Sequence, residues 1–256
     1  MDWGRAKTVL IVAFFALNIV LGYQLWLEWR ERIDSTVDWT SLPAEARQIM
    51  QEKNIRIEAK IPTDTPSLRD ITYKQQVPAG TAGDQRIAIE PPRETRIVFN
   101  NKELQQALGE VIPDLTRYQF DYYGSAGEGE YAFNRTVEGL PLFDAKLILY
   151  YSEQKIQGYS QDLIETLPSE GGPDQKVLPA TQALTSLILK KYLPAGAAVK
   201  EVQLGYHGQG IFNSDTQVAA PSWRILLEDG GVFYVNAASG EVSTDKETSL
   251  EPLSVP

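Results

Sequence analysis

Residues 221–242 read PSWRILLEDGGVFYVNAASGEV, and this stretch predicts a β-hairpin near the end of the chain. Two runs rich in apolar and aromatic residues, 221–229 and 231–242, meet at the tripeptide DGG, residues 229–231. Such runs around a glycine-containing turn are typical of two antiparallel strands. We therefore expect the C-terminal part of the chain to form a sheet.

A helix and another strand are expected before this hairpin. Pro179 begins a segment in which apolar residues recur at helical spacing, and Pro194 and Gly196 end it. The run VKEVQLGYHG, residues 199–208, has the composition of a strand. Residues 179–247 are therefore predicted to form one unit, in which a helix is followed by antiparallel strands.

The same order of elements is expected earlier in the chain. Asn100 followed by Glu103 resembles a capping box and predicts a short helix that runs through Val111. Strands are predicted to follow at residues 117–124, 130–137, 141–151 and 155–167. Because glycine-containing turns separate these runs, we expect them to pair as an antiparallel meander.

The folded region is expected to begin at Ser41 with a helix that reaches Lys53. Two short strands, at 55–61 and 70–77, are predicted after this helix. The run between the second strand and Arg96 is rich in Pro, Gly, Thr and Asp, which predicts a long loop.

The N-terminal segment differs from all of this. Residues 8–27, TVLIVAFFALNIVLGYQLWL, contain no charged residue. Twenty helical residues rise about 30 Å, the thickness of a bilayer's hydrocarbon core, whereas the apolar part of a signal peptide runs roughly 7 to 15 residues. No pair of small residues suited to signal cleavage ends the segment. We predict an uncleaved transmembrane helix at 8–27, between a cytoplasmic tail at 1–7 and a stalk at 28–40.

The orientation of this helix follows from its short N-terminal tail. Arg5 and Lys7 precede the helix, and Arg30 and Arg32 follow it, so the basic residues that govern topology are equal in number on the two sides. A tail of a few residues is the part expected to stay inside. We therefore place the N-terminus in the cytoplasm and the C-terminal domain outside the cell, on a single-pass protein of the cell membrane.

The expected fold is α+β, with a single N-terminal transmembrane helix and an ectodomain of two units. The units are predicted at 41–167 and 179–247, with a linker at 168–178 and a tail at 248–256. Each unit is a helix with an antiparallel sheet, and each is too small to bury a good core alone. We therefore expect the two units to pack together.

Asn18 is the one strongly polar side chain near the middle of the predicted transmembrane helix. In hydrocarbon its amide needs a partner, and a hydrogen bond to another helix is worth about 0.6 to 2 kcal/mol. The amide can instead bond to the backbone of its own helix. Both interpretations stay open from the sequence.

Composition excludes several classes of function. The formal net charge is -10, and residues 1–28 contribute nothing to it, so the excess acid lies in the ectodomain and argues against nucleic-acid binding. The chain has no cysteine and a single histidine, which excludes disulfides, cysteine zinc sites and multi-histidine metal centres. We expect no metal and no cofactor.

No residue is assigned a catalytic role. His207 is expected to be a solvated loop histidine beside a glycine turn. The carboxylates Glu128 and Glu130, or Asp121 and Asp144, resemble a glycosidase pair only in type. With 34 acidic residues in the chain such pairs arise freely, and most are expected to lie on solvated faces.

Both ends of the chain resemble one family. The N-terminus, MDWGRAKTVLIVAFFALNIVLGYQL, is similar to the start of the YycI (WalI) family, which has MDW, a basic pair and an apolar span containing Leu-Asn. LGYHGQG at 204–210 and the stretch 221–242 are similar to that family's closing LGY, P-x-W-R and Y-V-N-A-x-x-G strands. Residues 138–159 and the closing hairpin also resemble strands of PepSY-like modules, as in the YycH relatives.

The resemblance implies a non-enzymatic membrane accessory protein. Together with a YycH-like membrane partner, it would bind and modulate the essential YycG (WalK) sensor histidine kinase. This kinase belongs to the two-component system that governs cell-wall homeostasis in low-GC Gram-positive bacteria. The contact is implied to run largely through transmembrane helices in the lipid bilayer. On this sequence the residues expected to carry it are Phe14, Phe15, Asn18, Leu21 and Leu25. The alternative is an extracytoplasmic PepSY-like module that senses a ligand or inhibits a protease.

Overall fold

The computed structural model describes residues 42–76, 86–124, 127–168, 174–208 and 216–244, together with residues 7, 11, 13–15, 17–18, 20–21 and 23. The chain divides into two units, Met1–Thr40 and Ser41–Pro256. The described residues of the first unit are helical. Within the described part of the chain, no helix combines the length and the apolar character that crossing a membrane requires.

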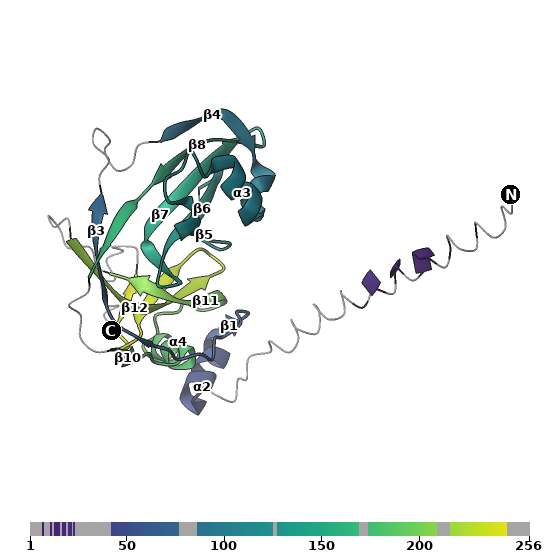
Figure 1. The fold of residues 1–256 in the computed structure, drawn as a ribbon. Coiled ribbons are helices and arrows are strands. Elements are labelled where there is room, and N and C mark those ends of the chain that lie inside the picture. The colour runs from purple at the N-terminus through teal and green to yellow at the C-terminus, as the bar shows by residue number, and fades with distance from the viewer. Residues whose placement is uncertain are drawn as a thin grey trace. The chain divides into compact units, whose positions relative to one another are not determined.

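The second unit is an α+β fold dominated by strands, as the sequence predicts (Figure 1). Its helices are α2 Ala44–Lys53, α3 Asn101–Leu108 and α4 Ala180–Leu189, with the 3-10 turns η2 Thr95–Phe99 and η3 Leu115–Arg117. The strands before α4 are β1 Arg56–Ile57, β2 Ser67–Leu68, β3 Ile71–Gln76, β4 Ile87–Glu94, β5 Tyr118–Phe120, β6 Glu130–Val137, β7 Leu140–Ser152, β8 Lys155–Gln161, β9 Leu163–Leu167 and β10 Gln175–Lys176. Those after it are β11 Ala198–His207, β12 Thr216–Leu227, β13 Val232–Asn236 and β14 Val242–Thr244.

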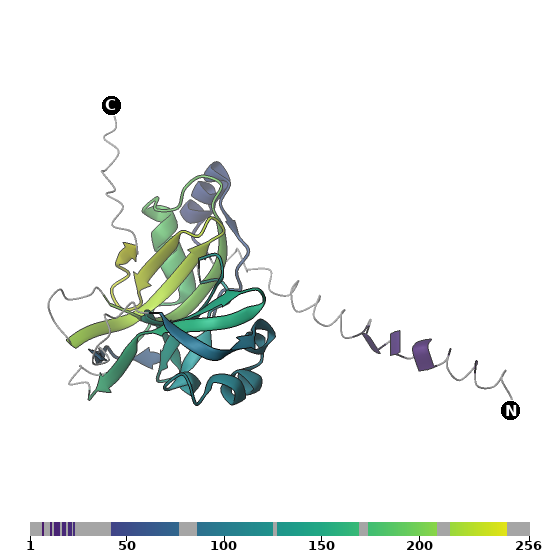
Figure 2. The same cartoon turned by 90° about the horizontal axis from the view of Figure 1, so that it is seen from above.

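Within the described residues, twelve strands form one sheet, whose central order is β14-β13-β12-β11-β7-β6-β5. The strands of the two predicted units are thus continuous, and Figure 2 shows the green and yellow strands beside the teal ones. The junction is the pair β11–β7, which runs parallel with Tyr206 opposite Leu142. The other neighbours along this path pair antiparallel, which confirms the meander before α4 and the closing hairpin.

Gly205 lets the two halves approach at this junction. A Cβ atom built on Gly205 would lie 2.5 Å from the carbonyl oxygen of Pro141 and 2.6 Å from the ring of Phe143. Atoms cannot come that close, so a side chain there would push β11 away from β7. The glycine of the LGY motif therefore permits the joining of the sheet.

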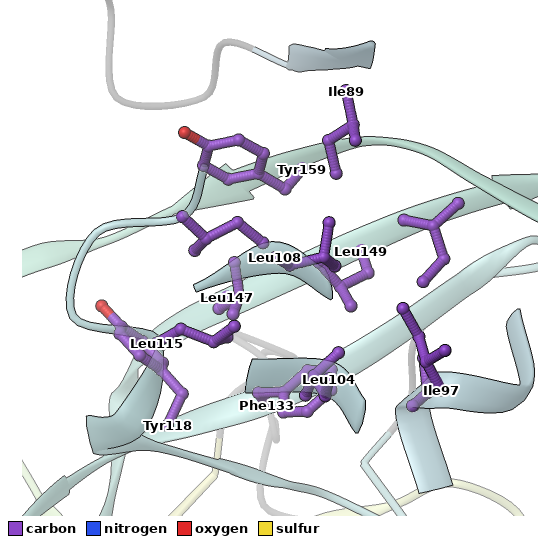
Figure 3. Packing of buried hydrophobic residues seen from close by; sticks show 13 residues of the cluster. Ile89, Ile97, Leu104, Leu108, Leu115, Tyr118, Phe133, Leu147, Leu149 and Tyr159 are labelled. Atoms are coloured by element: carbon purple, nitrogen blue, oxygen red, sulfur yellow. The ribbon is translucent and has the colours of Figure 1, made fainter. Parts of the chain in front are cut away.

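The helices cover different parts of the sheet. Helix α3 begins as predicted, because the Asn100 side chain accepts hydrogen bonds from the backbone nitrogens of Lys102 and Glu103 and donates one back to the Glu103 carboxylate. Its buried face joins a core cluster shown in Figure 3, which comprises Ile89, Ile97, Val98, Leu104, Leu108, Ile112, Leu115, Tyr118, Phe133, Leu147, Leu149, Ile156 and Tyr159. Helices α2 and α4 lie side by side at the other half, where Lys53 donates to the carbonyl of Leu193 (Figure 1).

Strands β1 and β3, which precede β4, also pack on the second half. Strand β1 pairs parallel with β11, and β3 pairs antiparallel with both β12 and β9. The residues that begin the first predicted unit therefore complete the sheet of the second. Exchange of strands between the halves lets them share a core, as their small size requires.

The long loop predicted before Arg96 is wrong in part, because β4 forms there and pairs with β8. Its strand pattern is hidden in the sequence by Pro91 and Pro92, which lack the N–H that a regular ladder needs. The pairing is accordingly irregular between Ala88 and Arg93. A proline pair is tolerated since β4 pairs with a single strand at the edge of the sheet.

Two other predicted strands are shorter than expected. The strand predicted at 117–124 ends at Phe120, because the Asp121 carboxylate accepts hydrogen bonds from the backbone nitrogens of Tyr123 and Gly124 and turns the chain. The strand predicted at 55–61 keeps only Arg56–Ile57. The single strand predicted at 155–167 is two, β8 and β9, which pair with different neighbours.

Candidate functional site

The predicted transmembrane contact residues lie on a helical segment. Phe14, Phe15, Asn18 and Leu21 are helical in the structure, and their side chains are exposed, whereas Leu25 lies outside the described residues. Residues four and seven positions apart share one side of a helix, so Phe14, Asn18 and Leu21 form a single face. Their role in binding stays a prediction.

Asn18 has a partner within its own helix. Its side-chain nitrogen donates a 2.9 Å hydrogen bond to the backbone carbonyl of Phe14, one turn earlier. This is the second of the two interpretations that the sequence leaves open. A donor that is satisfied internally has less need of a partner on another helix in hydrocarbon. Packing of the apolar side chains on this face therefore gains weight relative to the polar contact.

A group of buried and half-buried charged and amide side chains links the two halves of the sheet. We call Asp121, Asn134, Glu201, Gln203 and Arg224 the junction cluster. The Arg224 guanidinium donates to both oxygens of Asp121, at 3.0 Å for one of them, to Glu201 at 2.6 Å and to Gln203 at 3.0 Å. Asn134 donates to the Asp121 carboxylate at 2.8 Å. Residues from β6, β11 and β12, with Asp121 just after β5, are thereby tied together.

The pKa values of the two carboxylates in the junction cluster are shifted in opposite directions. Burial works to raise the pKa of Asp121, but the hydrogen bonds and charge of Arg224, with hydrogen bonds from Asn134 and Gly124, outweigh it and hold that pKa below its ordinary value. Burial raises the pKa of Glu201, and repulsion by Asp121 adds to this against the attraction of Arg224. Asp121 therefore provides the stable countercharge of the arginine.

Packing around this junction explains the tryptophan and the arginine of the P-x-W-R motif, Trp223 and Arg224. Arg224 is 5% exposed, and its guanidinium carbon lies 4.7 Å from the ring centre of Phe143. Trp223, fully buried, donates from its indole nitrogen to the carbonyl of Leu178 before α4. The sequence interpretation missed this role, although an arginine inside the apolar run WRILL is the signal that could have revealed it, since such a charge needs a buried partner.

The structure corrects the expectation of solvated acids for Asp121, which is 8% exposed and committed to Arg224. It also corrects His207, which is not a solvated loop residue. Its side chain at the end of β11 is 12% exposed, its Nδ1 lies 2.7 Å from Asp144, and its ring stacks on Tyr234 with centroids 3.7 Å apart. Asp144 also accepts from the backbone nitrogen of Gly208, so this group braces the end of β11.

The remaining candidate pair has a local role. The Glu130 carboxylate accepts a 2.7 Å hydrogen bond from the backbone nitrogen of Gly127, and Glu128 is exposed. The described residues include no group of three or more acidic, histidine or cysteine side chains placed to hold a metal ion. The other candidate pair is also divided, because Asp121 pairs with Arg224 whereas Asp144 pairs with His207.

The fold and its buried motif residues define a two-half α+β domain that follows an N-terminal helical segment. The model of the family described as YycI protein matches residues 40–238, so the chain belongs to the YycI family. This confirms the resemblance drawn from the two ends of the sequence. The family is a regulatory one, with an accessory role in the YycG/WalK system.

Other comparisons add little. No curated protein matches the chain. One similar solved structure, an uncharacterized protein from Eubacterium rectale, has a TM-score of 0.35 and 17% sequence identity. The similarity covers 46% of this chain and 43% of the Eubacterium rectale chain, so this chain spans less than half the length of that one. The family match alone identifies the chain.

Proposed function

We propose that this protein is a membrane-anchored accessory subunit of a YycG/WalK-like sensor histidine kinase and acts together with a YycH-like partner. Membership of the YycI family is the observation that carries the proposal. Residues 8–27 serve as its single span, the N-terminus is cytoplasmic, and the α+β domain lies outside the cell. The protein modulates the kinase without an enzymatic step of its own.

The contact with the kinase runs through the face of the N-terminal helix that holds Phe14, Asn18 and Leu21, with Phe15 beside it. Leu25, which lies outside the described residues, is expected to contribute as well. Lipid tails are as apolar as these side chains, so association between helices in a membrane depends on close packing and polar contacts. The internal hydrogen bond of Asn18 supports a contact in which packing dominates. Modulation requires that this face bind two states of the kinase with different affinity, typically by about 1 to 3 kcal/mol.

Copurification of the full-length chain with the kinase from membranes tests this proposal. We expect that replacing residues 8–27 by an unrelated apolar span of equal length abolishes recovery of the kinase. Asn18→Leu should reduce recovery only mildly, because the amide is already satisfied by Phe14. Val20→Leu is the matched control, since Val20 lies about 120° around the helix from Phe14.

Two outcomes contradict the proposal. If the span replacement leaves recovery of the kinase and its signalling output unchanged, the helix is only a tether. If the native chain recovers no kinase while it remains in the membrane, the accessory function itself is wrong for this protein.

A further inference from the structure

A cavity of about 430 Å³ lies where the β3–β9 ladder meets the end of β6. Its lining combines three arginines, Arg69, Arg117 and Arg135, with apolar side chains from the three strands. We call this cavity, with its three arginines, the arginine pocket. A cavity of this size is within the usual range for small-molecule sites, and the pocket is unusual in a chain whose net charge is -10.

Arg135 is the most constrained member of the pocket. It lies on β6 with its side chain 3% exposed, and its guanidinium carbon is 5.4 Å from the ring centre of Tyr118. Its Nη2 is 3.5 Å from the Asp114 carboxylate, but its buried Nε and Nη1 have no hydrogen-bond partner among the described residues. Burial lowers the pKa of this guanidinium. Burial of this positive charge beside the cavity favours an anionic occupant, because a nearby anion stabilises a charge that water solvates poorly.

The other two arginines are paired only loosely. Arg69 lies 3.6 Å from the Glu138 carboxylate, and Arg117 lies 3.8 Å from that of Asp114, which is shared with Arg135. These separations exceed hydrogen-bond length, and the side chains of Arg69 and Arg117 are 46% and 61% exposed. Among the described residues, the ion pairs of these three guanidinium groups involve two carboxylates, those of Glu138 and Asp114.

Two hydrogen bonds fix residues at the edge of the pocket. The Thr136 hydroxyl donates a 2.8 Å hydrogen bond to the carbonyl of Arg117 and fixes η3 against β6. Glu138 accepts from the Tyr206 hydroxyl at 3.3 Å, which ties the rim of the pocket to β11. The backbone of Arg117 and the side chain of Glu138 are therefore held in place, which lowers the entropic cost of binding.

We propose that the arginine pocket binds the phosphate group of a small phosphorylated molecule. A guanidinium matches a phosphate through paired N–H donors, and the exposed guanidinium groups of Arg69 and Arg117 can offer these donors to a ligand in the cavity. The volume exceeds what a lone phosphate fills, and Ile71, Val137 and Leu167 line the rest of the cavity. These apolar side chains suit the carbon part of an ester. The proposal is independent of kinase binding through the N-terminal helix.

Titration calorimetry on the full-length chain in detergent tests it, with glycerol 3-phosphate, inorganic phosphate and glycerol as probes at matched ionic strength. We expect glycerol 3-phosphate to bind more tightly than inorganic phosphate and glycerol not to bind. Arg117→Ala and Arg69→Ala should each weaken the affinity about tenfold or more, since each removes a charged donor. Both side chains are exposed, so the fold should tolerate their removal. Glu138→Gln should tighten binding, because it removes a competing carboxylate.

Arg96→Ala is the matched control. Arg96 is an exposed arginine paired at 2.7 Å with Glu94, and it does not line the cavity, so its removal changes the net charge equally without touching the pocket. Equal affinity of Arg117→Ala and the native chain for glycerol 3-phosphate would overturn the proposal, as would absence of binding by the native chain. Binding of inorganic phosphate alone would overturn the assignment of an ester. Kinase recovery from membranes should be unaffected by Arg117→Ala.

Discussion

Asp121→Ala probes the buried junction that holds the two halves of the sheet together. Breaking a buried ion pair by removing one partner costs about 3 to 5 kcal/mol when the other charge stays uncompensated. Here Glu201 still contacts Arg224 at 2.6 Å, so this part of the loss should fall to about 2 kcal/mol. The Asn134 amide also loses its acceptor in a buried position, which adds about 1 to 3 kcal/mol.

The expected total loss of unfolding free energy is therefore about 3 to 5 kcal/mol, which is a large part of the stability of an ordinary domain. Urea unfolding of the full-length chain in a non-ionic detergent, followed by tryptophan fluorescence, measures it. Trp223 is fully buried next to the mutated cluster and reports on this region. The midpoint should fall while the slope with urea stays unchanged, because the folded state remains intact.

Asp229→Ala is the control for this experiment. Asp229 is exposed and accepts a 2.9 Å hydrogen bond from the backbone nitrogen of Gly231, so its loss reports the cost of removing a turn-stabilising aspartate alone. We expect that cost to stay below about 1 kcal/mol. If Asp121→Ala and Asp229→Ala destabilise the domain equally, the buried pair does not hold the halves together and the reasoning fails.

Three further predictions concern the fold and its pH dependence. Gly205→Ala should lower stability by about 1 to 3 kcal/mol, because its Cβ would lie 2.5 Å from the carbonyl oxygen of Pro141; an unchanged melting temperature would contradict the junction geometry. Asn100→Ala should cost about 0.5 to 2 kcal/mol in urea unfolding, whereas Asn100→Ser should restore most of it if the cap matters. Because the pKa of Asp121 is lowered in the folded state, its ionised carboxylate stabilises the fold above the unfolded pKa of about 3.9, and this contribution is lost as the pH falls through the folded pKa. Asp121→Asn should therefore make the melting temperature fall less steeply in acid. Equal slopes for the two proteins would refute this.

Local signals in the sequence determined the elements that depend on a few neighbouring residues. The cap at Asn100 and the turn at 229–231 are examples, since each rests on contacts spanning about one turn of chain. Strand β6 has the predicted bounds because turns delimit it on both sides. The family resemblance also came from local motifs, at 204–210 and 221–242, and the match to residues 40–238 confirmed it.

Tertiary structure decided which of these elements meet. Arg224 finds Asp121 across 103 positions of sequence, and His207 finds Asp144 across 63, so neither pairing leaves a local trace. The arginine pocket likewise forms only where β3, β6 and β9 converge, and no residue spacing in the sequence predicts that these strands meet. The physical reason is that backbone preferences and turns act within a few residues. Strand register and buried charge pairing are instead settled only when distant segments share one core.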